Sequence, residues 1–155
     1  MLTLDDRKLL PLGVHDASLK EVEELFGRFQ RSDRRPKLFA KLRDYLKAVK
    51  NAEVAGSVIL NGSFVMACVD EPSDIDLILV LPTDWNWNAD LRPYQYNLVS
   101  KRRVRQAFRF DVFPVGEGSR EQADWIAFFS GIDVKWRRTF GWPDEAIKGL
   151  VRIKL

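Results

Sequence analysis

The chain has 155 residues, of which 46% are hydrophobic and 30% charged, and its formal net charge is +3 at pH 7. This length suits one domain with its own core, and the composition excludes a disordered chain. No apolar run approaches the roughly 20 residues that span a bilayer, and the N-terminus lacks a signal-peptide pattern, so we expect a cytoplasmic protein without membrane contact. One cysteine and one histidine exclude an internal disulfide and a cysteine- or histidine-rich metal cluster within the chain.

Two helices are predicted in the first third of the chain, after a lead-in over residues 9–17 that contains proline and glycine. Ser18 and Glu21 have the spacing of a capping box, and the apolar stripe that follows ends near Gly27. A second helix begins near Pro36, where apolar residues recur at helical spacing. Its basic residues lie largely off that stripe, which favours a solvated face over a nucleic-acid contact.

The segment 58–81 has the pattern of a strand, a tight turn, a short helix and a second strand. Ser63 can cap a helix over residues 64–69, and a helix start offers N–H groups and a positive dipole end that suit a phosphate. In the second strand Asp74 and Asp76 project from one face, because strand side chains alternate.

Two carboxylates on one strand face repel each other and raise each other's pKa unless a cation lies between them. Mg²⁺ prefers oxygen ligands and commonly binds one or two carboxylates together with substrate phosphates. Asp74 and Asp76, preceded by the Gly62-Ser63 turn, therefore predict a site for a metal and a phosphate. The alternative interpretation makes the two aspartates turn formers after Pro72-Ser73.

A polar loop and a helix are predicted next. The loop over residues 82–93 carries Trp85 and Trp87, which either cover the edge of the core or stack on a base. The helix over residues 94–107 ends in a basic run, which either complements the helix dipole or reaches an anionic substrate.

The remaining elements are a strand, a helix and a terminal strand. Residues 108–115 predict a strand that carries Asp111. Ser119 and Gln122 form a second capping box, and the helix they open closes at Gly131. Residues 150–155 alternate as an edge strand does, and the tryptophans between these last two elements are interpreted as packing groups.

The order of a strand, Gly62-Ser63, ten residues and Asp74-Ile75-Asp76-Leu77 resembles the signature of the nucleotidyltransferase superfamily typified by DNA polymerase β. The whole chain also resembles a small family of stand-alone minimal nucleotidyltransferases that carries only an unknown-function label. The resemblance implies an α/β (α+β) fold, with a small, mixed, mainly antiparallel sheet, helices packed on one side and the active site on the open face. One domain then spans residues 1–155, with N-terminal helices in 1–52, the catalytic core in 53–115 and a C-terminal helix and strand in 116–155.

The resemblance also implies a reaction and its residues. The reaction moves a nucleoside monophosphate from a nucleoside triphosphate to a hydroxyl group of a protein or RNA acceptor and releases pyrophosphate. Two Mg²⁺ ions, which Mn²⁺ can replace, are implied to bind three catalytic carboxylates, Asp74, Asp76 and Asp111. The implied nucleotide-binding residues are Gly62, Ser63 and Ser73.

Two departures from the family pattern leave an alternative open. Phe64 and Ala67 stand where many minimal members have an arginine and a glycine, so another basic group must hold the phosphates. About forty residues follow Asp111, too few for a base-binding helical domain, so a partner chain or the Trp85 loop must recognise the base. Such a minimal enzyme fits a toxin–antitoxin or defence pair. The alternative is a catalytically retired binding or regulatory module, against which the three mutually repelling carboxylates argue.

Overall fold

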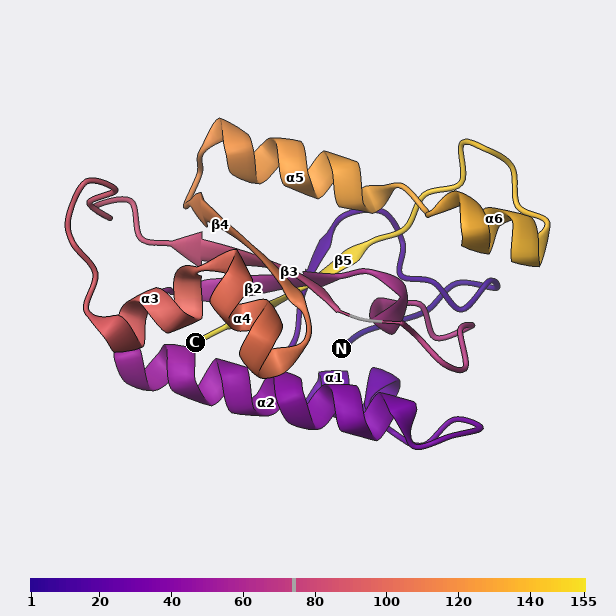
Figure 1. Ribbon diagram of the computed structural model, residues 1–155. Helices are drawn as coiled ribbons and strands as arrows, with labels where there is room; N and C mark the ends of the chain where they lie inside the picture. The colour runs from indigo at the N-terminus through magenta and orange to yellow at the C-terminus, as the bar shows by residue number, and fades with distance from the viewer. Residues whose placement is uncertain (74) are drawn as a thin grey trace.

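The fold is built on a five-stranded mixed sheet, and the computed structural model describes residues 1–73 and 75–155 (Figure 1). The strand order is β1-β5-β2-β3-β4. The strands are β1 (Val14–Asp16), β2 (Ser57–Asn61), β3 (Asp76–Leu81), β4 (Asp111–Gly116) and β5 (Leu150–Lys154). The described helices are α1 (Leu19–Phe26), α2 (Arg34–Ala52), α3 (Pro93–Val99), α4 (Lys101–Phe108), α5 (Arg120–Ser130), α6 (Val134–Phe140) and the short 3₁₀ helix η1 (Ser63–Val65).

Two strand pairings of the sheet are antiparallel and two are parallel within the described residues. β2 runs antiparallel to β3 and β5, whereas β4 runs parallel to β3 and β1 parallel to β5. The predicted mixed sheet is therefore confirmed, but the prediction that it is mainly antiparallel is wrong. The terminal strand β5 is also not an edge strand, because β1, which lies in the predicted lead-in, pairs with its outer side.

Helices cover both faces of the sheet, which gives three layers (Figure 1). On one face, Leu60, Leu77 and Val112 belong to the large core that α1 and α2 share with the strands. On the other, Ile59 and Ile78 pack in a cluster with apolar side chains of α5, namely Trp125, Ile126 and Phe129. The prediction of helices on one side and an open sheet face is therefore wrong, since α5 covers the second face.

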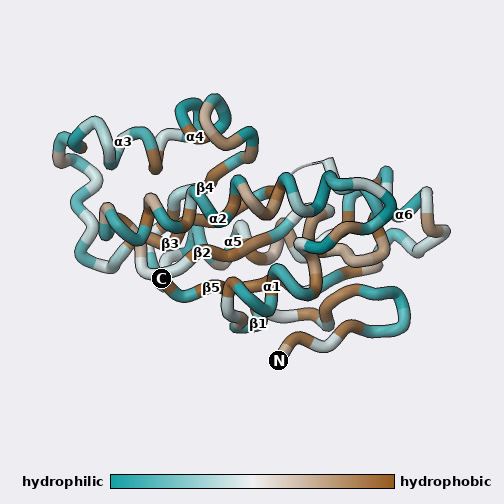
Figure 2. The backbone as a smooth tube through the Cα atoms, turned by 90° about the horizontal axis from the view of Figure 1, so that it is seen from below, coloured by the Kyte–Doolittle hydropathy of each residue, from teal (hydrophilic) through white to brown (hydrophobic). Residues whose placement is uncertain are grey.

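The hydropathy pattern shows why the core lies between these layers. Figure 2 shows hydrophilic and hydrophobic residues alternating along α2, while the central strands are largely hydrophobic. A helix with one apolar stripe buries that stripe, whereas a strand covered on both faces needs apolar residues on both. No helix within the described residues is long and apolar enough to cross a membrane.

The capping signals set the helix boundaries as predicted. Ser18 Oγ accepts a hydrogen bond from Glu21 N, and Ser119 Oγ accepts one from Gln122 N, each at 3.1 Å. Helix α1 ends at Gly27 and α5 ends at Gly131.

The segment between β3 and β4 differs from its prediction in two ways. The single helix predicted over residues 94–107 is two helices, because Ser100 caps α4 by accepting a hydrogen bond from Arg103 N. The strand predicted over residues 108–115 begins only at Asp111, since α4 extends to Phe108 and Arg109 has a left-handed φ of 66°.

Candidate functional site

Three polar residues lie side by side across the ends of three strands. Asp76 on β3 is the register partner of both Asn61 on β2 and Asp111 on β4. Their neighbours in sequence on the same strands, among them Leu60 and Leu77, face the α1–α2 layer. Because strand side chains alternate, the three polar residues project toward the layer that contains α5. Two of the predicted carboxylates are thus brought together; Asp74 lies outside the described residues.

The Gly62-Ser63 turn leads directly from Asn61 into η1. Gly62 has φ 87° and ψ −175°, a backbone conformation that residues with a Cβ rarely adopt. Ser63 Oγ accepts a hydrogen bond from Ser73 N at 3.3 Å, so two of the predicted nucleotide-binding residues meet. The prediction of a helix over residues 64–69 is wrong, since the regular structure there is limited to the 3₁₀ helix η1, Ser63–Val65.

The buried side chain of Arg35 holds the segment that follows the turn. This segment has little regular structure, so its carbonyl groups need donors from elsewhere. Arg35 is 1% exposed and donates hydrogen bonds at 2.7 to 3.2 Å to the carbonyl oxygens of Phe26, Phe64, Met66 and Val69. Desolvation lowers the pKa of Arg35 to about 10, which still leaves the guanidinium charged at neutral pH.

Phe64 and Arg34 complete the frame of the turn. Phe64 is fully buried, and its ring centre lies 5.6 Å from Arg35 Cζ, so Phe64 is a core residue. Arg34 donates hydrogen bonds to the carbonyl oxygens of Pro72 and Ser73, which holds the loop that leads toward Asp76. The sequence analysis predicted a role for neither arginine.

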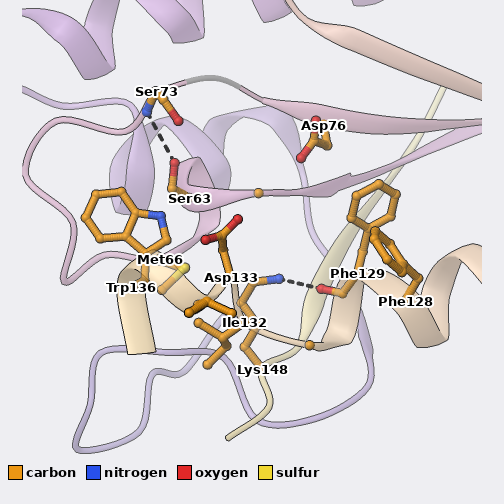
Figure 3. Close-up of a pocket in the computed structure, with 13 residues that line it drawn as sticks. Ser63, Met66, Ser73, Asp76, Phe128, Phe129, Ile132, Asp133, Trp136 and Lys148 are labelled. Carbon is orange, nitrogen blue, oxygen red and sulfur yellow. Dashed lines mark hydrogen bonds between the residues drawn. The ribbon is translucent and has the colours of Figure 1, made fainter. Parts of the chain in front are cut away.

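A cavity of about 400 Å³ opens between the Gly62-Ser63 turn and the segment that joins α5 to α6 (Figure 3). Ligand pockets commonly have volumes of about 300 to 1,000 Å³. Four of the predicted site residues line it: Gly62, Ser63, Ser73 and Asp76. The opposite wall was not predicted and includes Phe128, Phe129, Ile132, Asp133, Trp136 and Lys148. Asp111 is not among the residues that line this cavity.

Lys148 is the basic residue of the cavity wall. It is 3% exposed, and its Nζ donates a hydrogen bond to the carbonyl oxygen of Phe129 at 2.7 Å. Desolvation lowers the pKa of Lys148 to about 8, although the Asp76 carboxylate acts in the opposite direction. The sequence analysis did not predict this lysine; it predicted only that a basic group other than residue 64 would be needed.

The basic run before Asp111 contacts the third predicted carboxylate. Arg105 Nη1 lies 3.8 Å from Asp111 Oδ1 in a pair that is partly exposed to solvent. Lys101 Nζ lies 4.4 Å from the ring centre of Phe113, so it packs on β4. The prediction that this run binds an anionic substrate remains a prediction.

The tryptophans divide between packing and exposed positions. Trp85 is partly buried against the large core, whereas Trp87 is 59% exposed. Trp136 and Trp142 pack against a small cluster that includes Leu9, Met66 and Ile132, which confirms their predicted packing role. Trp136 also lines the cavity, a role that the sequence did not predict.

The donor set suits a hard metal ion, because Asp76 and Asp111 supply carboxylate oxygens at adjacent strand positions. In the part of the chain that the structure describes, no group of three or more histidine, cysteine, aspartate or glutamate residues lies close enough to hold a metal ion.

Fold and site together define a three-layer protein of mixed α/β structure with a carboxylate-bearing cavity at one end of its sheet. The chain belongs to a family of unknown function (DUF6932), whose model matches residues 2–154. No curated protein and no solved structure matches the chain.

Proposed function

We propose that the protein is a metal-dependent nucleotidyltransferase that transfers a nucleoside monophosphate from a nucleoside triphosphate to a hydroxyl group of a protein or RNA acceptor. The observation that carries the proposal is the register of β3 and β4, which pairs Asp76 with Asp111. The Gly62-Ser63 turn lies at the end of β2, the strand on the other side of Asp76. Carboxylates and a glycine turn at one end of a sheet are the parts that metal-assisted phosphoryl transfer requires.

Asp76, Asp111 and, by the sequence pattern, Asp74 would hold Mg²⁺, or Mn²⁺ in its place. When bound, such ions neutralise phosphate charge and activate the attacking hydroxyl. Without a cation between them, the paired carboxylates repel each other. The charge of Asp111 is partly neutralised by Arg105, whose Nη1 lies 3.8 Å from Asp111 Oδ1.

The turn residues have separate roles toward the phosphates. Gly62 lacks a Cβ, so a phosphate oxygen can approach its backbone closely. Ser63 Oγ accepts a hydrogen bond from Ser73 N and keeps its own proton, which it can donate to a phosphate oxygen. Ser73 thereby orients Ser63, while Arg34 holds Ser73 through its carbonyl oxygen at 2.9 Å.

The second candidate function is a retired nucleotidyltransferase domain that acts as a binding or regulatory module. The burial of Phe64 favours it, since the position of the usual phosphate-binding arginine is occupied by core. The same cavity would then bind a nucleotide without turnover. In either case we propose a partner chain, of the kind found in toxin–antitoxin and defence pairs.

The first test is calorimetric titration of the protein with each of the four nucleoside triphosphates, in Mg²⁺ and in chelator. We expect binding in Mg²⁺ that chelator abolishes, and a loss of about tenfold or more in Asp76→Asn, because a neutral amide is a poor ligand for a hard cation. Asp124→Asn is the matched control, since Asp124 is an exposed aspartate on α5. Unchanged affinity in a folded Asp76→Asn variant would contradict the assignment of Asp76.

The second test separates the two candidate functions. A nucleotide labelled at the α-phosphate is incubated with the protein and with RNA and protein fractions of a cell extract. Label that moves to either fraction with the parent and not with Asp111→Asn supports the enzyme. Metal-dependent nucleotide binding without any transfer supports the retired module.

A further inference from the structure

The ammonium group of Lys148 is buried and makes fewer hydrogen bonds than it can. A lysine ammonium carries three N–H donors. Among the described residues, the carbonyl oxygen of Phe129 is the acceptor that Nζ contacts, at 2.7 Å. Two donors are left at the wall of the cavity, where 3% exposure of the residue gives little access to solvent. Burying a cation with so few hydrogen-bond partners is costly. A ligand with hydrogen-bond acceptors would satisfy the two remaining N–H donors and offset this cost.

Asn61 provides an independent observation at the same end of the sheet. Its side chain is fully buried just behind the cavity lining, and within the described residues neither Nδ2 nor Oδ1 has a hydrogen-bond partner. Leu60 and Val151 form the last pair between β2 and β5 at this end of the sheet, and Asn61 and Lys148 both lie just beyond it. Buried polar groups are normally hydrogen-bonded, so the unused donors of Lys148, which does line the cavity, indicate contacts that form only with a ligand bound.

The charges of the cavity wall restrict the ligand. Asp76 and Asp133 line the cavity together with Lys148 (Figure 3). Asp133 Oδ1 accepts a hydrogen bond from Lys135 N at 2.8 Å, which leaves Oδ2 to accept from a ligand. A simple anion would meet two carboxylates there. A metal-bound phosphate chain would meet Asp76 through its metal and Lys148 through its oxygens, so it fits these two charges and leaves Asp133 to another part of the ligand.

The remaining wall is apolar. Met66, Ile132 and Trp136 line the cavity and pack in or against one small cluster. An apolar wall with an aromatic member suits the flat ring of a nucleobase. The Asp133 carboxylate, which accepts but does not donate, suits the hydroxyl groups of a ribose.

We propose that this cavity is the subsite for the nucleoside triphosphate, in which Lys148 binds the phosphate chain and the wall around Trp136 holds the base. The inference rests on the proposed function and deepens it. Lys148 then binds the phosphates in place of the arginine that many minimal nucleotidyltransferases have at the position of Phe64. The base is then held by the wall around Trp136, and neither the Trp85 loop over residues 82–93 nor a partner chain is needed for it.

Calorimetry in Mg²⁺ tests the two halves separately, with the four nucleoside triphosphates and inorganic tripolyphosphate as probes. Loss of a charge-assisted hydrogen bond predicts that Lys148→Met weakens binding of every probe by about tenfold to a hundredfold. Lys154→Met is the control, an exposed lysine on β5. Trp136→Leu is expected to weaken the nucleotides by about tenfold and leave tripolyphosphate unchanged, because only the nucleotides have a base. Trp87→Leu is the control for that variant, and Trp87 is exposed.

The outcomes separate this inference from the proposed function. Binding of nucleotides by the parent with equal affinity in Lys148→Met overturns the role of Lys148 and leaves the proposed function standing. A loss in Trp87→Leu that Trp136→Leu does not show moves the base to the loop and overturns the second half. No binding of any nucleotide by the parent overturns both. Thermal denaturation checks each fold, and Lys148→Gln, which can still donate to Phe129 O, replaces Lys148→Met if the methionine variant does not fold.

Discussion

Two buried polar residues at this end of the sheet lower the stability of the folded protein. Within the described residues, the buried ammonium group of Lys148 makes one hydrogen bond and the buried amide of Asn61 makes none. A buried charge is weak evidence for stability, because apolar replacements of similar volume are often neutral or stabilising. Such positions are expected where binding has been favoured over stability.

Lys148→Met is therefore expected to stabilise the protein without ligand, by about 1 kcal/mol or more at pH 7, although the lost attraction to Asp76 offsets part of the gain. Urea denaturation measures this difference. A lysine that served only the fold would give the opposite sign. Lys154→Met, in an exposed position, should lie within about 0.5 kcal/mol of the parent.

The pH dependence of that difference follows from the lowered pKa of Lys148, about 8 in the folded protein against 10.5 as the ordinary value. Between these two pH values the unfolded chain binds the proton that the folded chain has lost, so stability of the parent rises with pH there. The advantage of Lys148→Met is thus largest below pH 8 and shrinks toward pH 10.5. A difference that stays constant across this window would contradict the burial of a charged amine.

At the scale of elements, the segment 64–69 shows how tertiary contacts replace regular structure. Most of its residues are buried, so the segment lacks the polar face that a surface helix exposes to solvent. Its carbonyl oxygens instead receive hydrogen bonds from Arg35 on α2. The turn that precedes Asp76 is therefore positioned by a helix some thirty residues earlier in the chain.

Arg35→Met should destabilise the protein by about 3 kcal/mol or more, since several buried carbonyl oxygens lose their donor at once. Arg35→Lys should rescue little, because an ammonium cannot match the spread donors of a guanidinium. Chemical denaturation measures both variants. Arg31→Met is the control, as the exposed Arg31–Asp70 pair contributes at most about 1 kcal/mol.

The elements also show what local sequence can and cannot predict. The capping serines Ser18 and Ser119 act within four residues of the backbone groups that they bind, so both helix starts follow from sequence. Alternation places Asp76 and Asp111 on one face of their strands. The three-residue strand β1 has no such signal, because its pairing with β5 joins residues more than 130 positions apart.

The site shows the same division at the scale of the whole molecule. Its first wall is continuous in sequence, from Gly62 to Asp76, and four residues named from the motif line the cavity. Its second wall comes from residues 128–148, which reach the turn only because α5 covers the sheet face that the sequence predicted to be open. Lys148 and Trp136 belong to that wall, so no motif near Asp76 could reveal them.

A ligand bound between two such walls should stabilise the whole molecule. Any ligand that binds only the folded state contributes RT ln(1 + [L]/Kd), or about 2.7 kcal/mol at a concentration of 100 Kd. For a domain of this size that corresponds to a rise in Tm of about 5 to 10 °C. We expect this rise with Mg²⁺ and the preferred nucleoside triphosphate together, measured by scanning calorimetry, and not with either alone.

Variants in each wall of the cavity test whether both walls contribute to this rise in Tm. Asp76→Asn, on the first wall, and Lys148→Met, on the second, should each lose most of the rise, whereas Asp124→Asn should retain it. A full rise in Lys148→Met would mean that the nucleotide contacts the Gly62-Ser63 wall alone. Without a bound metal the carboxylates should repel the phosphates and weaken binding. A rise in Tm in chelator equal to that in Mg²⁺ would therefore contradict the role of a carboxylate-bound metal.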